Sequence, residues 1–235
     1  MPINPRVVIL TGAGISAESG LPTFRDANGL WEGHRFEDVA TPAAFARDPV
    51  LVHRFYNMRR AAARAVEPNP AHRAIARLEA AWPGQVTLVT QNVDGLHQRA
   101  GSRPICMHGE IAKARCARCN AVVGWEGELS TATACQACGK AGGMRPHIVW
   151  FGEVPMHMDE IFAALDRCDI FVAIGTSGVV YPAAGFASAA RASGSRCIEF
   201  NLVGTEVSSN FHEQVLGPAS VTVPTWVDGL LACGG

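Results

Sequence analysis

Four of the eight cysteines fall into two Cys-x-x-Cys pairs, Cys116 with Cys119 and Cys135 with Cys138. Each pair can place two thiolates on one side of a metal, so the two together complete a closed tetrahedral site. We therefore predict one structural zinc ion, with no position left for water or substrate. The alternatives are disulfides, and a zinc ribbon that binds nucleic acid. The second is disfavoured because only scattered basic residues lie nearby.

A glycine turn near the start of the chain is suited to holding phosphate. Residues 12–17 (GAGISA) match the G-x-G-x-x-G/A pattern, after an apolar run and before a predicted helix. Small residues there allow backbone amides to approach a pyrophosphate. A dehydrogenase also needs an acidic residue about 20 positions later, at the end of the next strand. The next convincing strand begins only at Gln85, which argues against hydride transfer.

Polar side chains gather where other predicted strands end. They lie at residues 90–94 (TQNVD), 175–177 (GTS) and 201–202 (NL), and His108 precedes the cysteine segment. Each group alone is an ordinary loop or helix cap. Because ligands of open parallel sheets bind at the carboxyl ends of the strands, the groups together predict a polar crevice.

The elements that must position these groups alternate along the chain. Buried strands are predicted at 6–11, 85–90, 170–174, 196–200 and 220–223, and helices at 49–64, 70–81, 158–167, 181–192 and 205–216. This alternation predicts an α/β fold, a Rossmann-like, largely parallel sheet with helices on both faces. We expect residues 1–29, 66–108 and 147–235 to form it. A helical insertion (30–65) and a zinc-binding module (109–146) are expected to form a small domain.

Composition narrows the class of protein. The chain has 235 residues, 48% of them hydrophobic, and a net charge of −1 without a basic stripe. We therefore expect no nucleic-acid partner. No apolar run approaches the roughly 18 residues of a membrane span, and no leader sequence is recognisable, so we expect no membrane partner and a cytoplasmic location.

Several segments together resemble the sirtuin family. They are GAGISAESGLPTFR (12–25), TQNVDGLHQRAG (90–101), MHGE (107–110), the paired Cys-x-x-Cys, RPHIVWFGE (145–153), GTSGVVYPAAGF (175–186) and Asn201-Leu202. The resemblance runs from about residue 6 to residue 225, in family order. It implies an NAD-dependent protein-lysine deacylase that yields nicotinamide, O-acyl-ADP-ribose and free lysine. The implied partners are acyl-lysine side chains of proteins or peptides.

The resemblance also assigns roles. His108 matches the catalytic histidine, a group that titrates near neutrality and can accept a ribose hydroxyl proton. The residues assigned to NAD are Gly12, Ala13, Gly14, Ser16, Phe24, Arg25, Gln91, Asn92, Asp94, Gly175, Thr176, Ser177, Asn201, Leu202 and Ala219. The peptide is expected to add as a strand between two edges, and the residues assigned to it are Val149, Phe151, Gly152, Glu153, Gly178 and Val179.

Tyr56 and Arg59 bear on the choice of acyl group. Residues three apart share a helix face, so a phenol and a guanidinium can converge on one carboxylate. In sirtuins this pair implies removal of succinyl or malonyl groups, with weaker deacetylation. The alternative is an exposed arginine beside a tyrosine packed in the core. For the whole chain, the alternatives are a deacetylase, an ADP-ribosyltransferase, an NAD-sensing module and a dehydrogenase.

Overall fold

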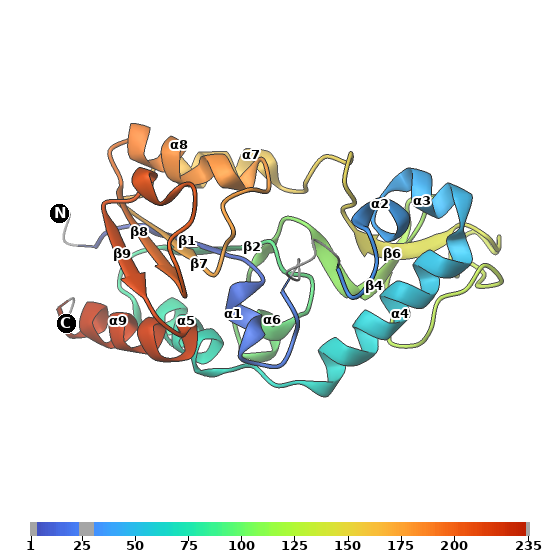
Figure 1. Ribbon diagram of the computed structural model, residues 1–235, viewed down its shortest axis with the longest axis horizontal. Helices are drawn as coiled ribbons and strands as arrows, with labels where there is room; N and C mark the ends of the chain where they lie inside the picture. Colours follow the sequence, from blue (N-terminus) through green and yellow to red (C-terminus); the bar gives the residue numbers. More distant parts are fainter. Residues whose placement is uncertain (1–3, 24–30, 234–235) are drawn as a thin grey trace.

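The computed structural model describes residues 4–23 and 31–233 and contains two sheets (Figure 1). The larger has six parallel strands in the order β3-β2-β1-β7-β8-β9. Their bounds are β1 Val7–Thr11, β2 Val86–Thr90, β3 Ile105–Cys106, β7 Ile170–Ile174, β8 Arg196–Asn201 and β9 Glu213–Leu216. The smaller is antiparallel, in the order β5-β4-β6, with β4 Gly109–Cys116, β5 Val122–Gly124 and β6 Met144–Ile148.

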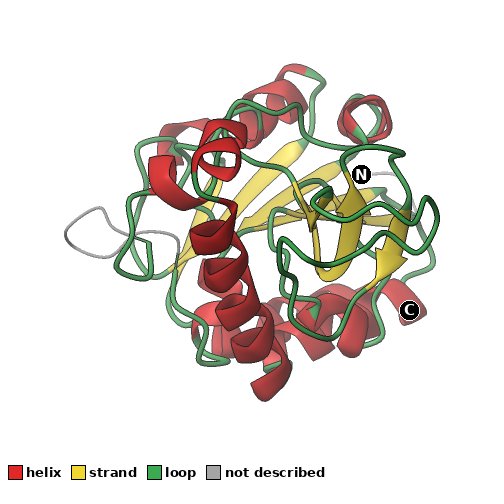
Figure 2. Cartoon of the chain, turned by 90° about the vertical axis from the view of Figure 1, so that its right-hand side faces the viewer, coloured by secondary structure: helices red, strands yellow, loops and turns green. Residues whose placement is uncertain are grey.

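Helices cover both faces of the larger sheet. On one face, α5 (Pro70–Ala81) and α9 (Ala219–Cys233) pack against Val7 and Ile9 of β1. On the other, α7 (Met158–Leu165) and α8 (Phe186–Ala192) pack against Val8 and Leu10. Successive side chains of a strand point to opposite faces, so a strand covered on both sides is apolar throughout. Figure 2 shows the strands between helical layers, and the predicted fold class is confirmed.

The remaining helices are short, except for one. They are α1 (Gly14–Ala17), α2 (Phe36–Val39), α3 (Pro42–Arg47), α4 (Pro49–Ala65) and α6 (Leu96–Arg99), with 3-10 turns at Ala183–Gly185 and Ser208–Asn210. The long α4 begins at Pro49, and Asp48 accepts a hydrogen bond from the Leu51 amide at 2.9 Å, as an N-cap does. The helices α2 to α4 share a hydrophobic core with Ile111, Ile148 and Trp150. No helix in the described ranges is long and apolar enough to cross a membrane.

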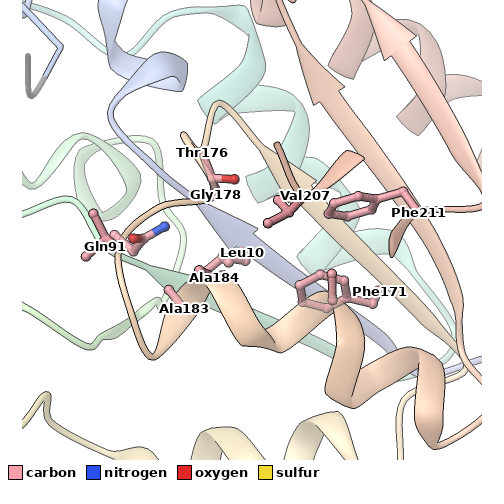
Figure 3. A pocket seen from close by; sticks show the side chains of 12 residues that line it. Leu10, Gln91, Phe171, Thr176, Gly178, Ala183, Ala184, Val207 and Phe211 are labelled. Atoms are coloured by element: carbon pink, nitrogen blue, oxygen red, sulfur yellow. The ribbon is translucent and has the colours of Figure 1, made fainter. Parts of the chain in front are cut away.

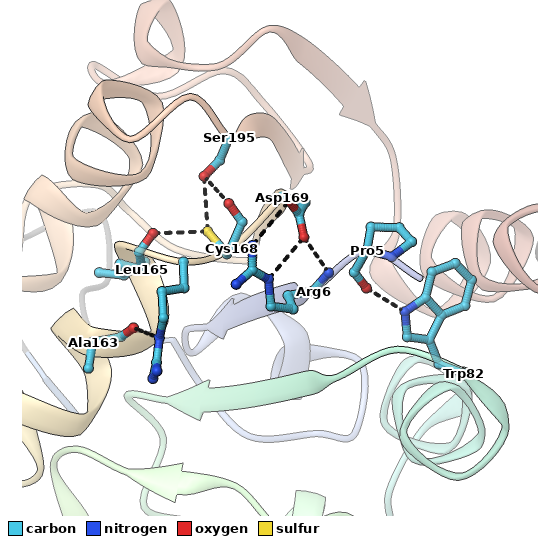
Figure 4. Close-up of polar contacts among 9 residues, drawn as sticks. Pro5, Arg6, Trp82, Ala163, Leu165, Cys168, Asp169 and Ser195 are labelled. Carbon is cyan, nitrogen blue, oxygen red and sulfur yellow. Dashed lines mark hydrogen bonds and ion pairs between the residues drawn. The ribbon is translucent and has the colours of Figure 1, made fainter. Parts of the chain in front are cut away.

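The amino ends of the central strands are fixed by polar contacts (Figure 4). Asp169, just before β7, accepts hydrogen bonds from the Arg6 amide at 2.7 Å and the Arg6 Nε at 3.2 Å. The Trp82 indole donates to the Pro5 carbonyl at 2.8 Å, and Ser195 donates to the Cys168 carbonyl at 2.8 Å. These contacts hold the edge of the sheet opposite to the predicted crevice.

Two predicted elements are wrong. Residues 220–223, predicted as a strand, lie in α9, where Val223 and Val227 are one helical turn apart and both buried in the core. Residues 205–216, predicted as a helix, instead form a turn and then β9. The Thr205 hydroxyl donates to the buried Glu199 carboxylate at 2.8 Å, which favours the turn over a continuous helix.

Candidate active site

Backbone hydrogen bonds join the turns at the carboxyl ends of β1, β2, β7 and β8. The Gly12 amide donates to the Ile174 carbonyl at 3.0 Å, and the Gly175 amide donates to the Phe200 carbonyl at 2.9 Å. The Gln91 amide donates to Thr11 at 2.9 Å. Four strands therefore present their loops at one edge, as predicted for the crevice.

The glycines of the first turn allow two loops to touch. A Cβ on Gly12 would lie 2.7 Å from the Gly175 carbonyl oxygen, and a Cβ on Gly14 would lie 2.7 Å from the Gly175 Cα. Gly175 itself has φ +61. The amides of Gly14, Ile15 and Ser16 already donate to backbone carbonyls within these turns. The glycines thus permit the two turns to pack closely, and a larger side chain at either position would clash with Gly175.

Ser16, Asn92 and Asp94 form a connected polar cluster beside this turn. The Ser16 hydroxyl donates to Asp94 Oδ2 at 2.8 Å, and Asn92 Nδ2 donates to Ser16 Oγ at 3.1 Å and to the Gly12 carbonyl at 3.0 Å. Burial raises the pKa of Asp94, while hydrogen bonds from the Leu96 amide and Ser16 act in the opposite direction. The amide and carboxylate are thus held in fixed orientations.

His108 is oriented by a backbone carbonyl. Its Nδ1 lies 3.0 Å from the Gln91 oxygen. A carbonyl can only accept, so Nδ1 carries the proton and Nε2 keeps its lone pair. Burial lowers the pKa of His108, and the bond to Gln91 partly opposes that effect. The ring is therefore neutral near pH 7, with Nε2 available as a base.

Gln91, Thr176 and Gly178 line one small pocket with apolar side chains that include Leu10 and Phe171 (Figure 3). Asn201 Nδ2 donates to the Thr176 carbonyl at 2.8 Å, which ties the end of β8 to this loop. Asn201 Oδ1 also accepts from the Leu202 amide at 3.0 Å. Gln91, Thr176, Gly178 and Asn201, which follow or end the strands β2, β7 and β8, therefore meet in this region.

Among the described residues, the others predicted to bind NAD lie outside these two clusters. Ser177 and Leu202 are exposed, Ala13 is half-buried, and Ala219 is the buried first residue of α9. Phe24 and Arg25 lie outside the described residues. Their roles stay predictions.

The segment after β6 is partly committed to internal contacts. The amides of Val149 and Phe151 donate to the carbonyls of His108 at 2.9 Å and Ala40 at 3.0 Å. The Glu153 carboxylate accepts from Arg145 at 2.7 Å and Arg115 at 2.9 Å. Glu153 therefore braces the segment. Gly152 has φ +89 and is exposed, and Val179, in the loop after β7, is 45% exposed.

Tyr56 and Arg59 lie one turn apart on α4. Tyr56 is 1% exposed, and its hydroxyl accepts a hydrogen bond from the Trp150 indole at 3.0 Å. The Arg59 guanidinium lies 4.2 Å from the centre of the Trp31 ring, and its side chain is only 19% exposed. Burial raises the pKa of Tyr56 and lowers that of Arg59. The tyrosine is in the core, as in the alternative interpretation, but the arginine is not an exposed surface residue.

Sequence reasoning missed Trp150 and Glu32 as neighbours of this pair. Trp150 lies within a quoted family segment, but nothing in the sequence indicates its bond to Tyr56, 94 positions away. Glu32 Oε1 lies 3.7 Å from Arg59 Nη1.

The four predicted ligand cysteines converge at the end of β4. Their Sγ atoms all lie within 4.8 Å of one another. The amides of Asn120 and Gly139 donate to the carbonyls of Cys116 at 2.9 Å and Cys135 at 2.8 Å, so both pairs form the same kind of turn. None of the described cysteines is in a disulfide. Four thiolate donors at this spacing fit a structural zinc ion and leave no open ligand position.

Comparison with known proteins adds the decisive observation, because residues 12–182 match the Sir2 family model. The chain belongs to the Sir2 family. A Salmonella typhimurium protein named NAD-dependent protein deacylase is 54% identical over 231 residues, which are 97% of this chain and 85% of the relative. One from Bdellovibrio bacteriovorus is 55% identical, over 96% of each chain.

Solved sirtuin structures agree with the fold. A Sir2 homolog in complex with NAD has a TM-score of 0.90 and 37% identity, over 99% of this chain and 91% of that one. A Sir2 protein bound to a myristoylated histone peptide has a TM-score of 0.75 and 32% identity, over 98% and 92% of the two chains. The sirtuin resemblance is confirmed: the protein is a Sir2-family enzyme, an NAD-dependent protein deacylase.

Proposed function

We propose that this sirtuin removes succinyl and malonyl groups from protein lysines, and acetyl groups more weakly. The observation that supports it is the Arg59 guanidinium, whose side chain is only 19% exposed and which lies one helical turn from Tyr56 and 4.2 Å from the centre of the Trp31 ring. Because Arg59 Nε has no hydrogen-bond partner among the described residues, the guanidinium suits a carboxylate, which a succinyl group carries and an acetyl group lacks.

His108 serves as the base in this proposal. NAD, when bound, supplies the ADP-ribose that receives the acyl group, with nicotinamide released. The Gln91 carbonyl holds the Nδ1 proton, so Nε2 can accept a proton from a ribose hydroxyl. We propose that Asn92 and Asp94 orient the nicotinamide end and that Gly12, Gly14, Thr176 and Asn201 contact the rest of the cofactor.

The peptide backbone is proposed to lie between residues 149–153 and 178–181. This placement is supported by the exposure of Gly152 and Val179 and by the proximity of Val149 to His108. The two-part domain division and the cytoplasmic location also stay predictions from the sequence.

The test compares succinyl-lysine and acetyl-lysine peptides of one sequence. Arg59→Met is expected to lower kcat/KM for the succinyl peptide about 10- to 100-fold, the effect of losing a charge-assisted hydrogen bond of ~1.5–3 kcal/mol. The acetyl peptide should change little. Arg54→Met, at an exposed position of the same helix, is the control. Faster acetyl than succinyl turnover by the unaltered enzyme would favour a deacetylase instead.

A further inference from the structure

The turn that carries Glu32 aims its carboxylate at Arg59. Trp31 and His34 exchange backbone hydrogen bonds of 2.8 and 3.0 Å, and the two residues between them, Glu32 and Gly33, have φ values of 51 and 77. Two positive φ values in succession are typical of a type I′ turn, which disfavours residues other than Gly, Asn and Asp. A glutamate is thus held in a conformation that its backbone disfavours, next to a buried cation.

The contact between Glu32 and Arg59 is incomplete. At 3.7 Å the two groups form an ion pair, but they are too far apart for a hydrogen bond. Arg59 Nε is buried and has no hydrogen-bond partner in the described part of the chain. The guanidinium is therefore neutralised while its donors stay unused.

In the described ranges, no other anion near Arg59 is equally free to leave the guanidinium. Asp94 is the other carboxylate that acts on the guanidinium, but its two oxygens accept bonds from Ser16 and the Leu96 amide. The Tyr56 hydroxyl is neutral and already accepts from Trp150. Among the described residues none donates a hydrogen bond to the Glu32 carboxylate, and its side chain is 24% exposed, so it can turn toward solvent.

We propose that Glu32 is the resident counter-ion of Arg59 and sets the breadth of acyl specificity. With a neutral acyl group bound, Glu32 stays beside Arg59 and cancels its charge in the apolar surroundings. An acidic acyl group must displace Glu32 before its carboxylate can take the donors of Arg59. The inference rests on the proposed succinyl and malonyl activity. In this proposal Glu32 weakens the binding of succinyl and malonyl groups and favours the binding of acetyl groups.

Glu32→Gln tests the inference because it removes the competing charge and keeps the side-chain size. We expect KM for a succinyl-lysine peptide to fall on the order of tenfold, from the loss of one like charge at close range. KM for the matched acetyl peptide should rise or stay constant, since the buried cation loses its counter-ion. Glu37→Gln, on α2 and paired with Arg35 instead, is the control.

The opposite result is equally informative. If Glu32 only positions Arg59, the variant will raise KM for the succinyl peptide, and the inference is overturned. Unchanged values for both peptides overturn it too. Glu32→Asn, which tolerates the left-handed turn better, replaces the glutamine variant if that variant melts early. Arg59→Met separates the two ideas: if it leaves acyl selectivity intact, the proposed function itself fails, whatever Glu32→Gln does.

Discussion

Two buried histidines beneath the glycine turn should make the protein sensitive to mild acid. His72 and His97 are no more than 1% exposed, and their rings are 4.7 Å apart. Thr11 donates to Thr90, so it accepts from His97 Nε2 at 2.9 Å. That leaves His97 Nδ1 buried and, within the part of the chain that the structure describes, without a hydrogen-bond partner, like Nε2 of His72. Burial lowers the pKa of His72 to about 4 and that of His97 to about 3.

The magnitude follows from linkage. Below a pKa of about 6.5 the histidines of the unfolded chain bind protons, whereas the buried rings of the folded protein stay neutral. The free energy of unfolding therefore falls as the pH drops. The loss continues down to the folded-state values. Between about pH 7 and about pH 5 each histidine should remove about 2 kcal/mol of unfolding free energy, because about 1.5 pH units lie between 6.5 and the lower limit. This figure depends on the unfolded chain more than on the depth of the native shift.

Urea unfolding at the two pH values, with His72→Gln as the perturbation, measures this contribution. An amide cannot take up the proton, so the acid-induced loss in the variant should be smaller than in the unaltered protein by about 2 kcal/mol. Any destabilisation that the substitution causes at both pH values cancels in this difference. His157→Gln, at an exposed histidine, should behave like the unaltered protein. An equal acid-induced loss with and without His72 would refute the reasoning.

Two further changes test the cysteine site and the glycine turn. Cys135→Ser, or chelation of the metal, should lower the melting temperature by several degrees together with activity, and a variant that melts normally but is inactive would instead point to a chemical role for the metal. Gly14→Ala should cost ~1–3 kcal/mol of stability and weaken NAD binding, because its Cβ would meet Gly175 at 2.7 Å. Gly127→Ala, with nothing within 4 Å of its Cβ, is the control, and equal melting and NAD binding in the two variants would contradict this interpretation.

The parts of the fold that were predicted correctly have a local signal in the sequence. The run VVIL of β1 is apolar at every position, which is the pattern of a strand that helices cover on both faces. The spacing of the cysteines is likewise a local pattern that predicts a metal site. The start of α9 has a distant cause. Its Ser220 amide donates at 3.0 Å to the Glu18 carboxylate, which lies 202 positions earlier. The β-branched run at 220–223 therefore predicted a strand that tertiary contacts override.

The residues of the candidate site also fall into those that a local motif predicts and those that only long-range contacts bring together. The sequence motifs are sufficient to single out His108 and Asn92, and the structure places both at the ends of strands, while their roles stay predictions. The environment of Arg59 is assembled from a turn at Trp31 and Glu32 and from the helix α4, and helix spacing alone could not distinguish a buried guanidinium from a solvated one. Contacts between residues far apart in the chain, such as that of Glu32 with Arg59, produce no periodic pattern in the sequence.

The smaller sheet explains how a closed metal site can matter to catalysis without taking part in it. The strand β4 begins directly after His108 and ends at Cys116, which pairs with Met144 of β6. At the other end Gly109 pairs with Ile148, two residues before the Trp150 that binds Tyr56. A metal ion held by the four cysteines would therefore fix one end of a strand pair whose other end adjoins His108 and Trp150. Loss of the ion should loosen both together, because the ladder between them transmits the change.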